Sequence, residues 1–235
     1  MASVQTYARV AGLLFLISFL AGSFGEFYVP TKLIVSGNAA ATMSNIAAHD
    51  SLFRLGFAAY LAEALCDVAI SLVLYALLRP VHRDLALLAA FFGLVSTALF
   101  GVCELFFFAG PVLLQGHHAY LQSFSREQID SLAYLCIRIY AFGGPLFMVF
   151  YGSASLVRGY LIYRSGYLPR FLGVLMTVAG VGFVLKNLTL VLAPAYSSDI
   201  LLVAAPLTVL VFGIWLIVKG VDTRTWDAAE VASSI

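Results

Sequence analysis

The chain has 235 residues, of which 62% are hydrophobic and 11% charged, with a formal net charge of +1. Soluble domains carry about 25% charged residues. So few charges cannot cover a water-exposed surface, so the chain must lie largely in lipid. The near-zero net charge and the lack of a long basic run predict no nucleic-acid partner and make the bilayer the first expected partner. The three cysteines lie in apolar runs, and an odd number argues against a disulfide framework.

Six apolar segments are each long enough to cross a membrane as a helix, because about 20 helical residues span the ~30 Å hydrocarbon core. They cover residues 9–29, 53–78, 84–114, 132–163, 167–192 and 200–218. The predicted fold class is therefore all-α: a polytopic membrane helix bundle of about six transmembrane helices, forming a single domain over residues 1–221. Residues 222–235 are expected to form a short, disordered cytoplasmic tail.

The linkers carry signals for helix boundaries. Residues 38–53 indicate a short amphipathic helix, with its apolar residues on one side. Ser125 followed by Gln128 is typical of a capped helix start before span four. Pro80 is expected to end span two, and Asp84 to cap span three.

Lysine and arginine residues are divided unequally between the two sides of the predicted bundle. The side of the termini carries eight: Arg9, Arg79, Arg83, Arg158, Arg164, Arg170, Lys219 and Arg224. The other side carries three: Lys32, Arg54 and Arg126. Because the more basic side faces the cytoplasm, both termini are expected there, in a cell (inner or plasma) membrane protein. The short amphipathic helix is then extracytoplasmic.

Four short motifs carry a family resemblance. The chain reads AGLLFL at 11–16, AAHDSLFRLG at 47–56, LLRPV at 77–81 and LALLAAFF at 85–92. Together they resemble DUF4386, a group of bacterial multi-pass membrane proteins defined as a domain of unknown function. The resemblance runs from span one to span six and implies this topology, without an activity, cofactor or ligand. Such proteins often carry Arg after the Phe-Phe pair, where this chain has Gly93.

Seven ionisable residues lie within the spans or at their ends, in the middle or outer part of each. They are Glu26, Arg54, Glu63, Asp67, Glu104, Arg138 and Lys186. Such groups are costly in lipid, so they usually face the bundle interior or water. The inner parts of the spans are almost purely apolar. The pattern therefore predicts a blind, outward-facing polar cavity rather than a conducting pore.

The leading hypothesis is that this cavity binds a small or lipid-like molecule. The candidate ligand-binding residues are Arg54, Glu63, Asp67, Glu104, Arg138 and Lys186. The basic side chains would receive anionic groups of the ligand, and the carboxylates would set the charge and orientation. A structural alternative is that Arg138 and Lys186 neutralise Glu63 and Asp67 and lock the spans together.

The carboxylates suggest two further hypotheses for the function. Glu63 and Asp67, four residues apart, share one helix face, and two nearby carboxylates repel, so one can keep a proton. This pattern fits a membrane-embedded enzyme, using acid/base or metal-assisted chemistry, or a proton-coupled transporter. The metal-ligand candidates are weak: His49, Glu26, His117 and His118. No sequence motif specifies a catalytic residue, a cofactor or an oligomeric state.

Overall fold

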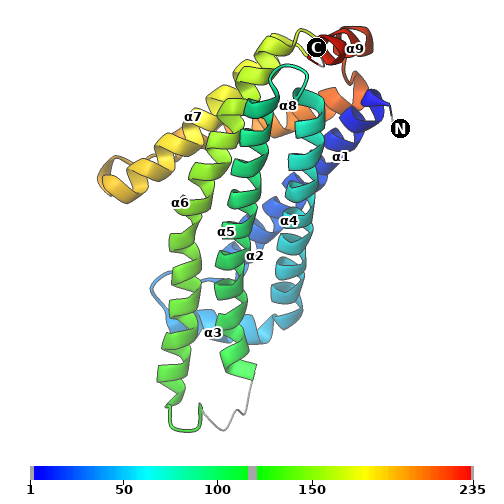
Figure 1. The fold of residues 1–235 in the computed structure, drawn as a ribbon. Coiled ribbons are helices and arrows are strands. Elements are labelled where there is room, and N and C mark those ends of the chain that lie inside the picture. The colour runs from blue at the N-terminus through cyan, green and yellow to red at the C-terminus, as the bar shows by residue number, and fades with distance from the viewer. Residues whose placement is uncertain (1–2, 116–120, 234–235) are drawn as a thin grey trace. The chain divides into compact units, whose positions relative to one another are not determined.

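The computed structural model describes residues 3–115 and 121–233, which form helices joined by short turns, without a strand in these ranges (Figure 1). Six helical segments in them are long and apolar enough to cross a membrane. These segments are Val4–Leu33, Asp50–Leu78, Arg83–Leu113, Arg126–Ser165, Arg170–Leu192 and Asp199–Val218. The predicted all-α polytopic fold is therefore confirmed.

The first span consists of three consecutive helical segments: α1 (Val4–Gly22), the π-helix η1 (Ser23–Tyr28) and α2 (Val29–Leu33). It continues beyond the predicted end at residue 29. Pro30 does not stop it, because proline is tolerated in the first turn of a helix, where its missing N–H is not needed.

The short helix predicted after span one is α3 (Ala39–Ala48), and Asn38 caps it by accepting a hydrogen bond from the Ala41 N–H at 2.9 Å. It ends at residue 48 rather than 53, because the backbone of His49 leaves the helical region (φ −126°, ψ 41°). The next helix, α4 (Asp50–Leu78), begins immediately afterwards.

The other elements follow in chain order. They are α5 (Arg83–Gln115), α6 (Arg126–Ser165), α7 (Arg170–Leu192), the 3₁₀ turns η3 (Pro194–Tyr196) and η4 (Asp199–Leu202), α8 (Ala204–Val218) and α9 (Thr223–Ser233). The predicted cap before α6 is confirmed: Ser125 Oγ accepts from the Gln128 N–H at 3.2 Å, and Gln128 Oε1 accepts from the Ser125 N–H at 2.8 Å. The predicted cap of α5 is wrong, since Asp84 lies inside the helix.

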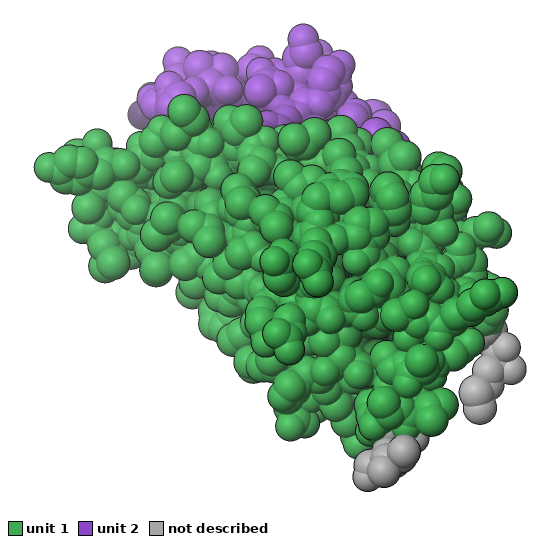
Figure 2. Space-filling view, turned by 90° about the horizontal axis from the view of Figure 1, so that it is seen from above, with its two compact units in different colours: residues 1–19, 65–98, 145–235 green, residues 20–64, 99–144 purple. Residues whose placement is uncertain are grey.

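By its internal contacts the chain divides into two compact units, which Figure 2 colours separately. Unit 1 comprises Met1–Phe19, Leu65–Ala98 and Pro145–Ile235, and unit 2 comprises Leu20–Ala64 and Leu99–Gly144. The single bundle domain expected over residues 1–221 stays a prediction.

The core of unit 1 is apolar and shared by its helices. Phe15 of α1 meets Phe212 of α8 edge to face, with ring centroids 5.4 Å apart. Leu74 of α4, Leu161 of α6 and Leu172 of α7 are buried in the same core. Large apolar side chains also remain exposed along the helices, as expected for surfaces that lie against lipid.

Glycines allow α6 and α7 to touch along their backbones. A Cβ atom on Gly159 would lie 2.8 Å from the Gly173 carbonyl oxygen, and one on Gly173 would lie 2.7 Å from the Gly159 carbonyl oxygen. Gly152 and Gly180, seven residues away on each helix, make the same reciprocal contact at 2.9 Å. Small residues let membrane helices approach closely, so these two glycine pairs set the packing of α6 against α7.

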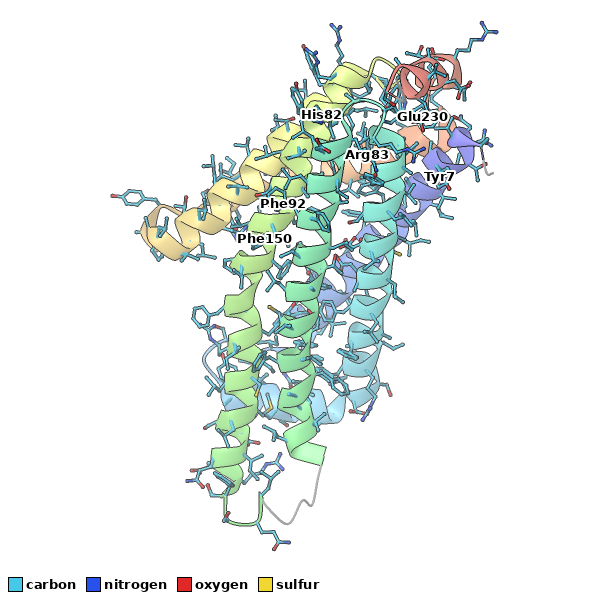
Figure 3. All side chains as sticks on the ribbon, in the orientation of Figure 1. Tyr7, His82, Arg83, Phe92, Phe150 and Glu230 are labelled. Atoms are coloured by element: carbon cyan, nitrogen blue, oxygen red, sulfur yellow. The ribbon has the colours of Figure 1, made fainter. Side chains whose placement is uncertain are left out.

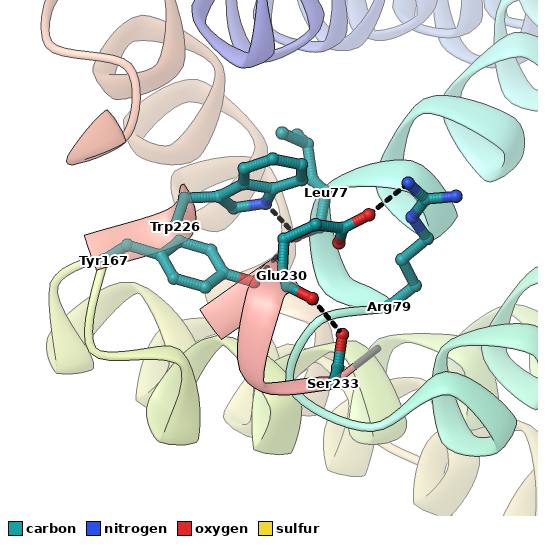
Figure 4. A network of polar contacts seen from close by, with 6 residues as sticks. All are labelled: Leu77, Arg79, Tyr167, Trp226, Glu230 and Ser233. Atoms are coloured by element: carbon teal, nitrogen blue, oxygen red, sulfur yellow. Dashed lines mark hydrogen bonds and ion pairs between the residues drawn. The ribbon is translucent and has the colours of Figure 1, made fainter. Parts of the chain in front are cut away.

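The expectation of a disordered tail is wrong, because residues 223–233 form α9. Its Trp226 Nε1 donates to the Leu77 carbonyl oxygen at 3.0 Å, and Glu230 forms an ion pair with Arg79 (Figure 4). The Tyr167 hydroxyl donates to the same Leu77 oxygen at 2.7 Å. Burial raises the pKa of the Tyr167 phenol, which keeps it a neutral donor. These contacts hold a largely polar helix against the end of α4.

The start of α9 depends on the carboxylate of Asp222. This carboxylate accepts hydrogen bonds from the backbone N–H of Thr225 (3.3 Å) and Arg224 (3.1 Å) and from the Thr225 hydroxyl (3.0 Å). These bonds, chiefly the one from the Thr225 backbone, lower the pKa of Asp222 from its ordinary 3.8. A lowered pKa in the folded state means that the cap contributes fully above pH 3.8 and is lost as the pH falls through the folded value.

We therefore expect α9 to loosen in acid. In a Trp215→Phe protein, where Trp226 is the remaining tryptophan, its fluorescence should shift to the red below pH 3.8. Asp222→Asn should remove the part of this acid transition that depends on the cap, because asparagine does not titrate. An unchanged acid profile in Asp222→Asn would show that the cap does not hold α9.

Candidate functional site

Two tyrosine hydroxyls form a buried hydrogen-bonded chain in unit 2. Tyr60 of α4, which is 1% exposed, donates to the Gly25 carbonyl oxygen at 2.7 Å. The Tyr140 oxygen lies 2.9 Å from the Tyr60 oxygen. Because the one hydroxyl hydrogen of Tyr60 points to Gly25, Tyr140 is the donor in the tyrosine pair. The chain therefore ties α4 and α6 to the first span.

The segment that receives this bond is the π-helix η1, which contains Glu26. π-Helical turns are rare within α-helices and are frequent at functional sites. Glycines beside and within it bring other side chains onto the backbone. A Cβ atom on Gly25 would lie 3.0 Å from the Tyr60 ring, and one on Gly22 would lie 2.7 Å from the Glu63 carboxylate.

Glu104 of α5 is the least exposed carboxylate among the described residues, at 3%. Both of its oxygens are buried, and neither accepts a hydrogen bond or joins an ion pair with any residue that the structure describes. Glu26 lies near enough to act on it electrostatically, and Glu26, Glu63 and Glu104 all act on the Tyr140 hydroxyl. We refer to Glu26, Tyr60, Glu63, Glu104 and Tyr140 as the acid–tyrosine cluster.

Aromatic rings pack around this cluster. The ring of Phe107 lies 5.4 Å from that of Tyr60 and 5.0 Å from that of Tyr140, centroid to centroid. Phe100 lies 5.8 Å from Tyr60, and Phe53 stacks on Phe107 at 5.0 Å. This apolar shell lowers the local dielectric constant, so an uncompensated charge inside it is costly.

The structure does not bring the predicted basic residues of unit 2 to Glu104. Arg54 forms an ion pair with Asp50 at 2.7 Å in the first turn of α4. The Arg138 guanidinium lies over the ring of Phe142, 5.1 Å from its centroid, and Phe142 is 72% exposed. Arg138 therefore points away from Glu104, the buried carboxylate of α5.

A second polar cluster lies in unit 1. Asp67 of α4 accepts a hydrogen bond from the Ser18 hydroxyl at 3.0 Å, and Ser71, one turn later, accepts one from Arg158 Nη2 at 3.1 Å. Arg158 is only 4% exposed. A Cβ atom on Gly93 would lie 2.7 Å from Arg158 Nη2, so the glycine provides space for the guanidinium.

Arg158, counted above among the basic residues on the side of the termini, is buried inside α6 and does not add to the charge of an exposed loop. Without it the basic residues divide seven against three. The only signal for its burial was its position inside the predicted span 132–163.

Lys186, another candidate of unit 1, forms an ion pair with Asp199 at 3.5 Å, which links α7 to η4. Tyr140 was not a candidate for the polar site, because aromatic residues in spans more often pack or face the membrane interface.

The two metal-ligand candidates that the structure describes lie on different elements. His49 is exposed at the end of α3, with Nδ1 3.0 Å from the Asn45 carbonyl oxygen, whereas Glu26 belongs to η1. His117 and His118 lie outside the described residues. Among residues 3–115 and 121–233, no group of three or more His, Cys, Asp or Glu side chains could hold a metal ion.

The six apolar spans and the buried polar clusters define a polytopic helical membrane protein. The chain belongs to the family described as "Domain of unknown function (DUF4386)", whose family model matches residues 10–220. It is also similar to an uncharacterized protein of Archaeoglobus fulgidus, with 29% identity over 154 residues, covering 66% of this chain and 76% of the relative. No solved structure matches the chain.

Proposed function

We propose that this membrane protein binds a cation, in the simplest case a proton, at Glu104, as part of proton-coupled transport. The observation that carries the proposal is the burial of both Glu104 oxygens without a hydrogen bond or ion pair to any described residue. A bare carboxylate in such surroundings costs several kcal/mol, so the site favours an added positive charge. The hydroxyls of Tyr60 and Tyr140 provide neutral polar groups in the same cluster.

The contacts also favour a cationic ligand over the anionic one considered from the sequence. An anion near Glu104 would be repelled by Glu26, whereas a proton or a protonated amine would be attracted by both carboxylates. Arg138 is stacked on Phe142 and points away from the cluster. Binding of a small or lipid-like molecule in an outward-facing cavity stays part of the proposal, with an amine as its polar group. A membrane-embedded enzyme using the same carboxylates as acid and base stays the alternative.

The orientation is also part of the proposal. Seven basic residues against three support termini in the cytoplasm of a cell (inner or plasma) membrane protein. The π-helix with Glu26 is followed directly by α2 and α3. In the proposed orientation α3 belongs to the less basic, outer side. In this orientation the acid–tyrosine cluster is closer to the outer surface.

Proton binding at Glu104 can be tested by infrared spectroscopy of the protein in lipid vesicles. We expect wild type to show a titrating band of a protonated carboxyl group that Glu104→Gln lacks. Glu127→Gln, the same change at an exposed position in the first turn of α6, should keep the band. Identical spectra for wild type and Glu104→Gln at every pH would refute proton binding by this residue.

Transport is tested separately, with vesicles that enclose a pH-sensitive dye. After an external pH step, Glu104→Gln should slow the internal pH change by about tenfold or more, because a positioned proton-transfer group typically contributes 10²–10⁴-fold. Glu127→Gln should match wild type. A wild-type band without any flux would restrict the function to cation binding.

A further inference from the structure

A surface cavity of about 490 Å³ lies in unit 1, where the turn between α4 and α5, the end of α6 and the helix α9 meet. Its polar lining includes His82, Arg164 and Ser233, and its apolar lining includes Val81 and Ala229. His82 and Glu230 are labelled at this end of unit 1 in Figure 3. The volume lies within the range of ligand pockets, about 300–1,000 Å³.

The cavity has an uncompensated positive charge. Arg164 is exposed and makes no ion pair or hydrogen bond with any residue in the described part of the chain. Arg79, three residues before His82, differs in this respect, because it forms an ion pair with Glu230. His82 Nδ1 accepts a hydrogen bond from the Leu85 N–H at 3.3 Å. The ring hydrogen of neutral His82 is therefore on Nε2, which gives the cavity lining a second donor.

The cavity lies beside the C-terminal ends of two candidate membrane spans, where lipid headgroups are expected. Helix α4 ends at Leu78 and α6 ends at Ser165. Tyr160, which also lines the cavity, is 50% exposed, as is common for tyrosine at this depth. A cationic group beside an apolar wall fits an amphiphile with an anionic headgroup.

We propose that this cavity binds the phosphate group of an anionic phospholipid. The Arg164 guanidinium can hold a phosphate through two parallel hydrogen bonds, and His82 Nε2 can donate a third. Basic pockets between membrane helices bind lipid headgroups in the same way. Val81 and Ala229 provide the apolar wall, so docking of α9 completes the site. The site shares no residue with the acid–tyrosine cluster, so the two proposals can fail independently.

The test is native mass spectrometry of the purified full-length protein, incubated with phosphatidylglycerol or with phosphatidylcholine. Wild type should retain phosphatidylglycerol preferentially, and Arg164→Gln should reduce the retained lipid by about tenfold, the effect of losing one charged hydrogen-bonded contact. Arg170→Gln is the matched control, because Arg170 lies over the Tyr163 ring and does not line the cavity. Equal retention by Arg164→Gln and Arg170→Gln would overturn the proposal.

A competition arm distinguishes a lipid from a free phosphate. If glycerol phosphate displaces phosphatidylglycerol only at a large excess, the lipid is the occupant. If glycerol phosphate binds as well as the lipid, the phosphate site stands and the lipid is overturned as its occupant. Trp226 fluorescence in a Trp215→Phe background shows whether α9 is still docked in Arg164→Gln. Glu104→Gln should retain lipid as wild type does, whatever its effect on proton binding.

Discussion

Replacing Gly159 with alanine should destabilise the protein by about 1–3 kcal/mol, the effect of forcing atoms into a well-packed interface. The added Cβ would lie 2.3 Å from the Thr177 hydroxyl oxygen and 2.8 Å from the Gly173 carbonyl oxygen. The second of these belongs to the α7 backbone, which cannot withdraw without also opening the contact between Gly152 and Gly180. The loss of stability from this clash should therefore exceed the gain in stability that alanine usually gives over glycine in a helix.

Thermal unfolding in detergent measures this effect, and Gly101→Ala is its control. A Cβ atom on Gly101 meets nothing within 4 Å, so alanine there should be neutral or should stabilise α5 by up to about 1 kcal/mol. Gly159→Ala should thus lower the midpoint of unfolding, whereas Gly101→Ala should leave it unchanged or raise it. Equal midpoints would mean that α6 and α7 do not approach through their glycines.

Replacing Glu104 with leucine should raise the stability of the protein, by an amount comparable with the ~1–4 kcal/mol found when buried ion pairs are replaced by apolar side chains. Glu104 is 3% exposed, its oxygens have no described partner, and Phe107 belongs to the same aromatic surroundings. The same variant should lose the titrating carboxyl band. A gain in stability together with a loss of proton binding is typical of a residue retained for function rather than for folding.

Thermal unfolding at neutral pH measures the gain, with Glu127→Leu as the control. Glu127 is exposed in the first turn of α6, so its replacement should change stability by no more than about 0.5 kcal/mol. If Glu104→Leu unfolds at a lower temperature than wild type, the carboxylate contributes to folding, and the argument for a cation site loses its basis.

The spans themselves were predictable, because apolar length is a direct consequence of membrane thickness. Their ends were predictable where a local signal exists, as at Ser125 and Gln128. The end of span one, predicted at residue 29, was missed, because the helix continues to Leu33 with Pro30 in the first turn of α2. The order in the tail was missed because its composition is polar, whereas Trp226 and Glu230 make specific contacts with the end of α4.

The candidate site was only partly predictable, for a reason specific to membranes. Helix rise gives the depth of a residue, and depth alone suggested that Arg138 could neutralise Glu63. Depth does not tell in which direction a side chain points around the helix axis. In a soluble protein the polar face of a helix shows which side chains point toward water. Lipid is as apolar as a protein core, so the hydrophobic pattern of a membrane helix does not tell side chains that face the bundle from those that face lipid. Arg138 is stacked on the exposed Phe142, and Arg158 is buried.

The burial of Arg158 bears on how the chain is assembled during synthesis. An arginine in the middle of a single helix opposes membrane insertion by about 2.5–3.5 kcal/mol. Its partners here, Ser71 on α4 and Gly93 on α5, both precede α6 in the chain. They have therefore left the ribosome before Arg158 does. The earlier spans can act as a template that receives the guanidinium, so that α6 enters the bilayer beside them rather than alone.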